Sequence, residues 1–133
     1  MIIAIDFDGT VVKHRYPEIG EDNGAIPVLR KLLDRRHKLI LFTMRSHPIN
    51  EGDRDTLQEA MDWFSERGID LYGVNENPTQ SLWTDSPKPY ANIYIDDSAL
   101  GCPLHPDGSV DWESVDAFFI FNGLYGKKPE STD

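Results

Sequence analysis

Short apolar runs alternate with helical patterns along the chain, and this alternation limits the fold more than any other feature. β-prone apolar runs predict strands at 1–5, 39–42, 69–74 and 92–96. Apolar residues at helical spacing predict helices that start near Ile26, Leu57 and Asp111. Strands alternating with helices predict an α/β fold, a doubly wound (Rossmann-like), mostly parallel sheet with helices on both faces.

The connecting segments predict one domain. Residues 11–23 contain Pro17 and Gly20, which predicts a loop or hairpin-like flap after the first strand. Residues 75–90 contain three prolines, so they should hold a short helix at most. The 133-residue chain suits a single domain over 1–125, followed by a polar tail over 126–133.

The composition excludes several classes of protein. The formal net charge of −10 argues against nucleic acid as a partner, because binding phosphates needs clustered Lys and Arg. No apolar run approaches the roughly 20 residues that span a bilayer, so we expect no membrane partner. Cys102 is the one cysteine, which rules out an intrachain disulfide and agrees with a cytoplasmic location.

Two pairs of carboxylates follow predicted strands. Asp6 and Asp8 end the first strand, and Asp96 and Asp97 end the fourth. Asp and Gly are common turn residues, so the first pair alone could be a loop feature. Two strands that each end in acids, however, can converge on one cation, because ligands bind beyond the carboxyl ends of strands in open parallel sheets. Acids held close together need such compensation.

Two more residues complete an ordered set. The second strand ends in Thr43, and Lys88 precedes the fourth strand. The order Asp-x-Asp-Gly-Thr, then Thr, Lys and an acidic pair resembles that of the haloacid dehalogenase superfamily of phosphohydrolases, over roughly residues 1 to 100. The resemblance implies a haloacid dehalogenase-like core and a hydrolase, namely a phosphatase that cleaves phosphate monoesters. The spacing on either side of Thr43 resembles that of a capless member.

The resemblance also implies a role for each motif residue. Asp6 would be the nucleophile that forms an aspartyl-phosphate, and Asp8 the general acid and base. Asp8 would have to carry a proton when the substrate binds, which we expect from crowding by neighbouring acids. Thr43 and Lys88 would contact the phosphoryl group. The metal, Mg²⁺, would be bound by Asp6, the main-chain carbonyl of Asp8, Asp96 and Asp97.

Residues that select the substrate are expected beside the first and second strand ends. These substrate-binding candidates are Lys13, His14, Arg15, Thr43, Met44 and Arg45. The substrate would be a small phosphorylated molecule or an exposed phosphate on a macromolecule. A capless site is open to solvent, so a neighbouring subunit of a homo-oligomer is one source of cover.

Two other classes of protein share some of these features. A catalytically silent relative would keep the fold and bind or scaffold without turnover, although Asp8 has no obvious structural task in such a protein. A receiver-like phosphoacceptor module also uses acids, a Thr or Ser, a Lys and Mg²⁺. In receivers the Lys comes near the end of the chain, whereas Lys88 precedes the acidic pair here.

Overall fold

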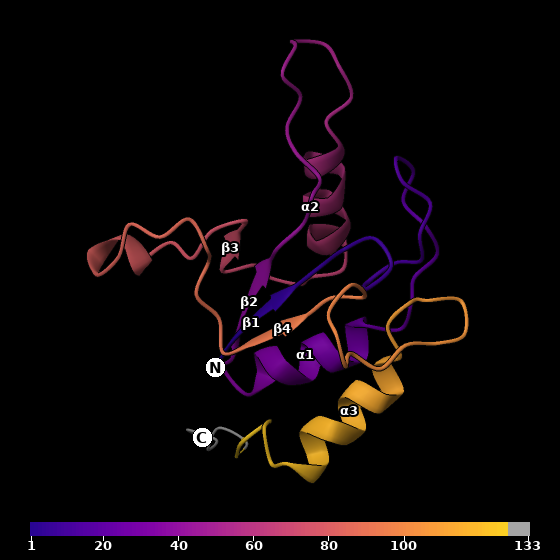
Figure 1. Ribbon diagram of the computed structural model, residues 1–133, viewed down its shortest axis with the longest axis vertical. Helices are drawn as coiled ribbons and strands as arrows, with labels where there is room; N and C mark the ends of the chain where they lie inside the picture. Colours follow the sequence, from indigo (N-terminus) through magenta and orange to yellow (C-terminus); the bar gives the residue numbers. More distant parts are fainter. Residues whose placement is uncertain (128–133) are drawn as a thin grey trace.

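The computed structural model describes residues 1–127 and shows the predicted alternation of strands and helices (Figure 1). The elements in chain order are β1 (Ile2–Ile5), α1 (Ile26–Asp34), β2 (Lys38–Leu41), α2 (Thr56–Glu66), β3 (Gly73–Val74), the 3-10 helix η1 (Gln80–Leu82), β4 (Ile93–Ile95) and α3 (Trp112–Phe121). Of the predicted tail, residues 128–133 lie outside the described part.

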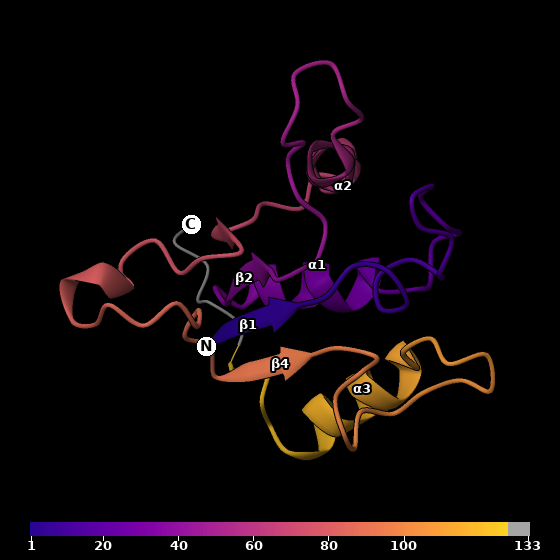
Figure 2. The same cartoon turned by 45° about the horizontal axis from the view of Figure 1, so that its top comes forward.

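The four strands form one sheet in the order β3-β2-β1-β4, and every neighbouring pair is parallel. The doubly wound α/β fold is therefore confirmed. From β1 the chain moves through β2 to β3 on one side, and β4 then joins β1 on the other side (Figure 2). The strand order thus reverses between β1 and β4, which is where such sheets bind ligands.

One face of the sheet carries the main core. Side chains of β1 and β2 pack there with buried residues of all three α-helices, including Leu29 of α1, Phe64 of α2 and Phe119 of α3. On the other face Ala4 and Ile40 pack with Ala91, from the long β3–β4 connection that contains η1. The predicted helices on both faces are therefore unequal, because three α-helices cover one face and the connection with the short 3-10 helix η1 covers the other.

Strand β3 is shorter than predicted. The sequence indicates a strand over 69–74, but only Gly73–Val74 pair with β2. Ile69 is instead part of the end of α2, where its N–H donates to the carbonyl of Phe64 at 3.0 Å. Gly68, at φ +68°, supplies the left-handed turn that this ending needs. Terminating the helix therefore uses residues that could otherwise extend the strand.

Candidate functional site

Three carboxylates meet at the carboxyl ends of β1 and β4. Asp6 directly follows β1, and Asp96 and Asp97 directly follow β4. Because β1 and β4 are parallel neighbours, these three residues lie at the same edge of the sheet. One carboxylate oxygen from each lies within 4.8 Å of the others. The structure thus brings together three of the four acids predicted to bind a metal.

Buried Thr10 links the two strand ends. Its hydroxyl donates to Asp6 Oδ2 at 3.0 Å and accepts from the N–H of Asp97 at 3.1 Å. Its carbonyl accepts from Asn23 Nδ2 at 2.9 Å and from Trp112 Nε1 at 2.7 Å. The turn after β1 is therefore tied both to the acids and to the start of α3. The sequence placed Thr10 in the motif without indicating this role.

Gly9 allows this turn to approach the acids. Its φ is +84°, in the left-handed region that side chains rarely adopt. A Cβ built on Gly9 would lie 2.4 Å from Asp97 Oδ2 and 2.2 Å from His14 Nε2, closer than any real contact. Glycine at this position thus serves both the backbone conformation and the packing of the site.

Crowding and burial act on the carboxylates unequally. Burial, with the nearby charge of Asp96, raises the pKa of Asp6 to about 7. Burial also raises the pKa of Asp96. Burial would do the same to Asp97, but hydrogen bonds from His14, Asp6 and Asp96 hold its pKa below the usual value. Without a cation, Asp6 is therefore the acid of the three that retains its proton to the highest pH.

Asp8 has different surroundings from those expected. Both of its oxygens accept from Arg45, with Nε to Oδ2 and Nη2 to Oδ1 each at 2.8 Å. The expectation that neighbouring acids crowd Asp8 is therefore wrong, because crowding falls on Asp6 and Asp8 faces a cation. The side chain of Arg45 is only 1% exposed and four of its five N–H groups are already donated, so its predicted contact with a substrate stays a prediction.

Most of the predicted residues line one cavity above the strand ends, the acidic cavity, which has a volume of about 490 Å³. Its lining consists of Asp6, Asp8, His14, Tyr16, Thr43, Met44, Arg45, Asp96, Asp97 and Ser98. The hydroxyl of Thr43 accepts from the N–H of Arg45 at 3.1 Å, which leaves its own hydrogen free to donate. His14 binds Asp97 at 2.8 Å, and Met44 is almost wholly exposed at the rim. Tyr16 and Ser98 were missed, since neither carries a sequence signal apart from its nearness to a motif.

Three predicted residues do not line this cavity. Lys13 pairs with Asp107 at 3.2 Å, and Arg15 is exposed. Lys88 is exposed on the β3–β4 connection, where its ammonium lies 5.1 Å from the ring centroid of Tyr94. The predicted contact of Lys88 with a phosphoryl group stays a prediction.

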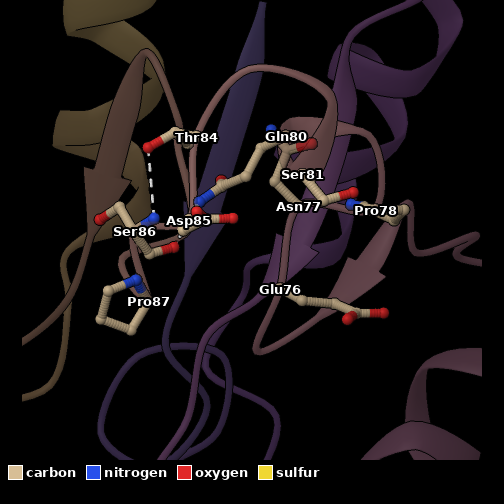
Figure 3. A pocket seen from close by; sticks show the side chains of 9 residues that line it. All are labelled: Glu76, Asn77, Pro78, Gln80, Ser81, Thr84, Asp85, Ser86 and Pro87. Atoms are coloured by element: carbon tan, nitrogen blue, oxygen red, sulfur yellow. Dashed lines mark hydrogen bonds between the residues drawn. The ribbon is translucent and has the colours of Figure 1, made fainter.

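Gln80 holds the loop that carries Lys88. Its amide donates to the carbonyls of Ser86 at 3.0 Å and Lys88 at 2.8 Å, and it accepts from the N–H of Tyr90 at 2.7 Å. Figure 3 shows Gln80 beside Ser86 and Asp85 in a second cavity of about 370 Å³. This cavity shares no lining residue with the acidic cavity.

Replacing Thr10 by valine should loosen the acidic cluster. Valine keeps the shape of the side chain but removes both hydrogen bonds, leaving the N–H of Asp97 without its partner. We expect a loss of about 1–3 kcal/mol in the free energy of unfolding, measured by urea denaturation. Thr10→Ser, which keeps the hydroxyl, is the matched control. A Thr10→Val variant as stable as the wild type would show that the two hydrogen bonds do not stabilise the cluster.

Among residues 1–127, no helix has both the length and the apolar character needed to cross a membrane. No family model matches the chain, and no curated protein matches it. The chain is similar to a solved structure of a conserved protein from Bacteroides thetaiotaomicron, with 34% sequence identity and a TM-score of 0.68. The match covers 96% of this chain and 98% of that one. This chain therefore belongs to the same family as the conserved Bacteroides thetaiotaomicron protein.

Proposed function

We propose that the protein is a Mg²⁺-dependent phosphatase of the haloacid dehalogenase type, which hydrolyses phosphate monoesters through an aspartyl-phosphate on Asp6. The observation that carries the proposal is the convergence of Asp6, Asp96 and Asp97 at two neighbouring strand ends. The Thr43 hydroxyl lines the same cavity. The single cysteine agrees with the cytoplasmic location that we include in the proposal.

The acids fit a hard divalent cation. All three groups of the cluster offer carboxylate oxygens, the ligand type that Mg²⁺ prefers over nitrogen and sulfur. Burial, together with the nearby charge of Asp96, raises the pKa of Asp6, and a bound cation would offset this shift. Asp6, Asp96 and Asp97 would hold the ion, with the main-chain carbonyl of Asp8 as the further ligand that the motif implies. When bound, Mg²⁺ supplies positive charge that offsets the negative charge of the phosphoryl group.

The residues of the cavity then divide the chemistry between them. An oxygen of Asp6 attacks phosphorus while the bond to the leaving oxygen breaks, and that oxygen takes a proton from Asp8. Water then attacks the aspartyl-phosphate and gives a proton to Asp8, which restores the Asp6 carboxylate and releases phosphate. The Thr43 hydroxyl, with its hydrogen free, donates to a phosphoryl oxygen.

Hydrolysis of 4-nitrophenyl phosphate, with Mg²⁺ or with EDTA, tests the proposal. We expect turnover with Mg²⁺ and a loss of at least about 100-fold when EDTA removes the ion, because unshielded carboxylates repel a phosphate. Asp96→Asn should need much more Mg²⁺ to reach half-maximal rate, whereas Asp85→Asn, an exposed acid in the second cavity, should match the wild type. Full activity in EDTA would refute the metal. Calorimetric Mg²⁺ binding without turnover would instead favour a silent relative.

A further inference from the structure

Arg45 stands out among the charged residues of the protein. Within residues 1–127 it is the one charged residue that is buried, with 2% of its surface exposed. It lies in the loop between β2 and α2, two residues after Thr43. The guanidinium is therefore buried, although Arg45 belongs to the lining of the acidic cavity, and this burial costs desolvation free energy unless its partners compensate.

The contacts of Arg45 fix its position from several sides. Nη2 donates to the carbonyl of Glu18 at 3.0 Å, and Nη1 donates to the carbonyl of Thr56 at 3.2 Å. The guanidinium carbon lies 5.1 Å from the ring centroid of Phe7 and 5.2 Å from that of Tyr16. Contacts from the flap, from the first residue of α2 and from the end of β1 thus all hold the planar guanidinium.

Two further N–H groups of this fixed guanidinium, on Nε and Nη2, are directed at Asp8. The two hydrogen bonds, each at 2.8 Å, form a fork that sets the plane of the carboxylate as well as its place. Stability alone gives little reason to keep such a pair, since apolar residues of similar volume often stabilise a fold as well. The pair of Arg45 and Asp8 fixes the orientation of the Asp8 carboxylate, which apolar packing would not do.

We propose that Arg45 is a positioning residue, which aims the carboxylate of Asp8 at the leaving oxygen and at the attacking water. This inference rests on the proposed function, in which Asp8 moves both protons. A protonated Asp8 keeps one oxygen as an acceptor for Arg45 and offers its O–H to the leaving group. Arg45 itself does not touch the substrate, because its side chain is only 1% exposed and four of its five N–H groups are taken up by Asp8 and by the carbonyls of Glu18 and Thr56.

Arg45→Lys is the variant that separates charge from orientation. Lysine keeps the positive charge but cannot form the fork, so Asp8 should lose its fixed plane. We expect kcat/KM for phenyl phosphate to fall by about 100-fold, the scale that a misplaced catalytic group produces. Arg54→Lys is the matched control. Arg54 also binds Glu18 of the flap, at 2.9 Å, but it is exposed and makes no contact with Asp8. The kcat/KM of Arg54→Lys should stay within about twofold of the wild-type value.

A double-mutant cycle distinguishes positioning from a general structural role. If Arg45 acts through Asp8, adding Arg45→Lys to Asp8→Asn should lower kcat/KM by less than about threefold further. Additive losses in the cycle would overturn the inference. The substrate gives a second readout, because a leaving 4-nitrophenolate needs little protonation whereas phenolate is about as basic as tyrosinate. The loss in Arg45→Lys should therefore be clearly smaller for 4-nitrophenyl phosphate, and equal losses would overturn the inference.

The same experiment keeps the two proposals apart. A wild type that hydrolyses both esters only with Mg²⁺, combined with an additive cycle, would leave the phosphatase standing and remove the role of Arg45. A wild type without turnover would overturn the phosphatase, and the positioning role with it. Thermal unfolding of Arg45→Lys checks its fold, and Asp8→Asn/Arg45→Lys, which removes one charge of the pair, is checked in the same way.

Discussion

Replacing Asp6 by asparagine is expected to lower the turnover of 4-nitrophenyl phosphate by a factor of at least about 10⁴, since the covalent intermediate cannot form without its nucleophile. The amide of the introduced side chain has nearly the shape of the carboxylate and can still accept the hydrogen bond from Thr10. It cannot attack phosphorus, however, and it contributes no charge to the metal site. Initial rates at saturating Mg²⁺ measure the effect.

The control for Asp6→Asn must separate lost chemistry from lost structure. Asp85→Asn removes an exposed carboxylate outside the acidic cavity and should keep the wild-type rate. Circular dichroism should show the same helix content in the wild type and in both variants. If Asp6→Asn kept more than about a tenth of the wild-type rate, Asp6 would not be the nucleophile.

The fold was largely predictable because its signals are local. Apolar spacing around α1, α2 and α3 and the apolar runs of β1, β2 and β4 each identify an element within a few residues. The parallel order then follows from the alternation of strands with helices. The length of β3 was not predictable in this way, because Ile69 serves both an apolar run and the turn that ends α2, and only the packed structure decides between them.

The acidic cluster was predictable for a related reason. Parallel neighbouring strands place their carboxyl ends together, so two strands that each end in acids bring them to one edge. The flap residues were harder, because a loop sets no direction for its side chains. His14 reaches Asp97, while Lys13, its neighbour, turns to Asp107. Spacing along the sequence carries no information on which of the two enters the cavity.

Arg45 shows where sequence reasoning ends. From the sequence, Arg45 is expected to help select the substrate, because it lies in the loop that follows the second strand, two residues after Thr43. Its partner Asp8 is 37 residues away, and the carbonyls it binds come from the flap and from the first residue of α2. Arg45 is buried because these separate segments come together in the fold, so its burial could not be predicted from the sequence.

The contribution of Asp6 to the stability of the metal-free protein should decrease as the pH rises from about 4 to about 7. Asp6 has a pKa of about 7 when folded against 3.8 for an ordinary aspartate. Between these values the unfolded chain releases the proton while the folded protein retains it, so unfolding becomes more favourable with increasing pH. The difference corresponds to about 4 kcal/mol at most, complete above pH 7. Urea unfolding in EDTA from pH 4.5 to 8.5 measures it.

Comparison with Asp6→Asn isolates this effect from every other titrating group. Asparagine does not ionise, so the variant should equal the wild type near pH 4 and exceed it by up to about 4 kcal/mol at pH 8 in EDTA. Excess Mg²⁺ should then stabilise the wild type at pH 8 and leave the variant nearly unchanged, because binding to the folded state alone adds stability. This result would show that Asp6 weakens the fold without a cation, which would indicate that Asp6 is retained to bind one. If the two unfolding curves instead differ by a constant amount at all pH values, burial of the Asp6 charge is not the cause.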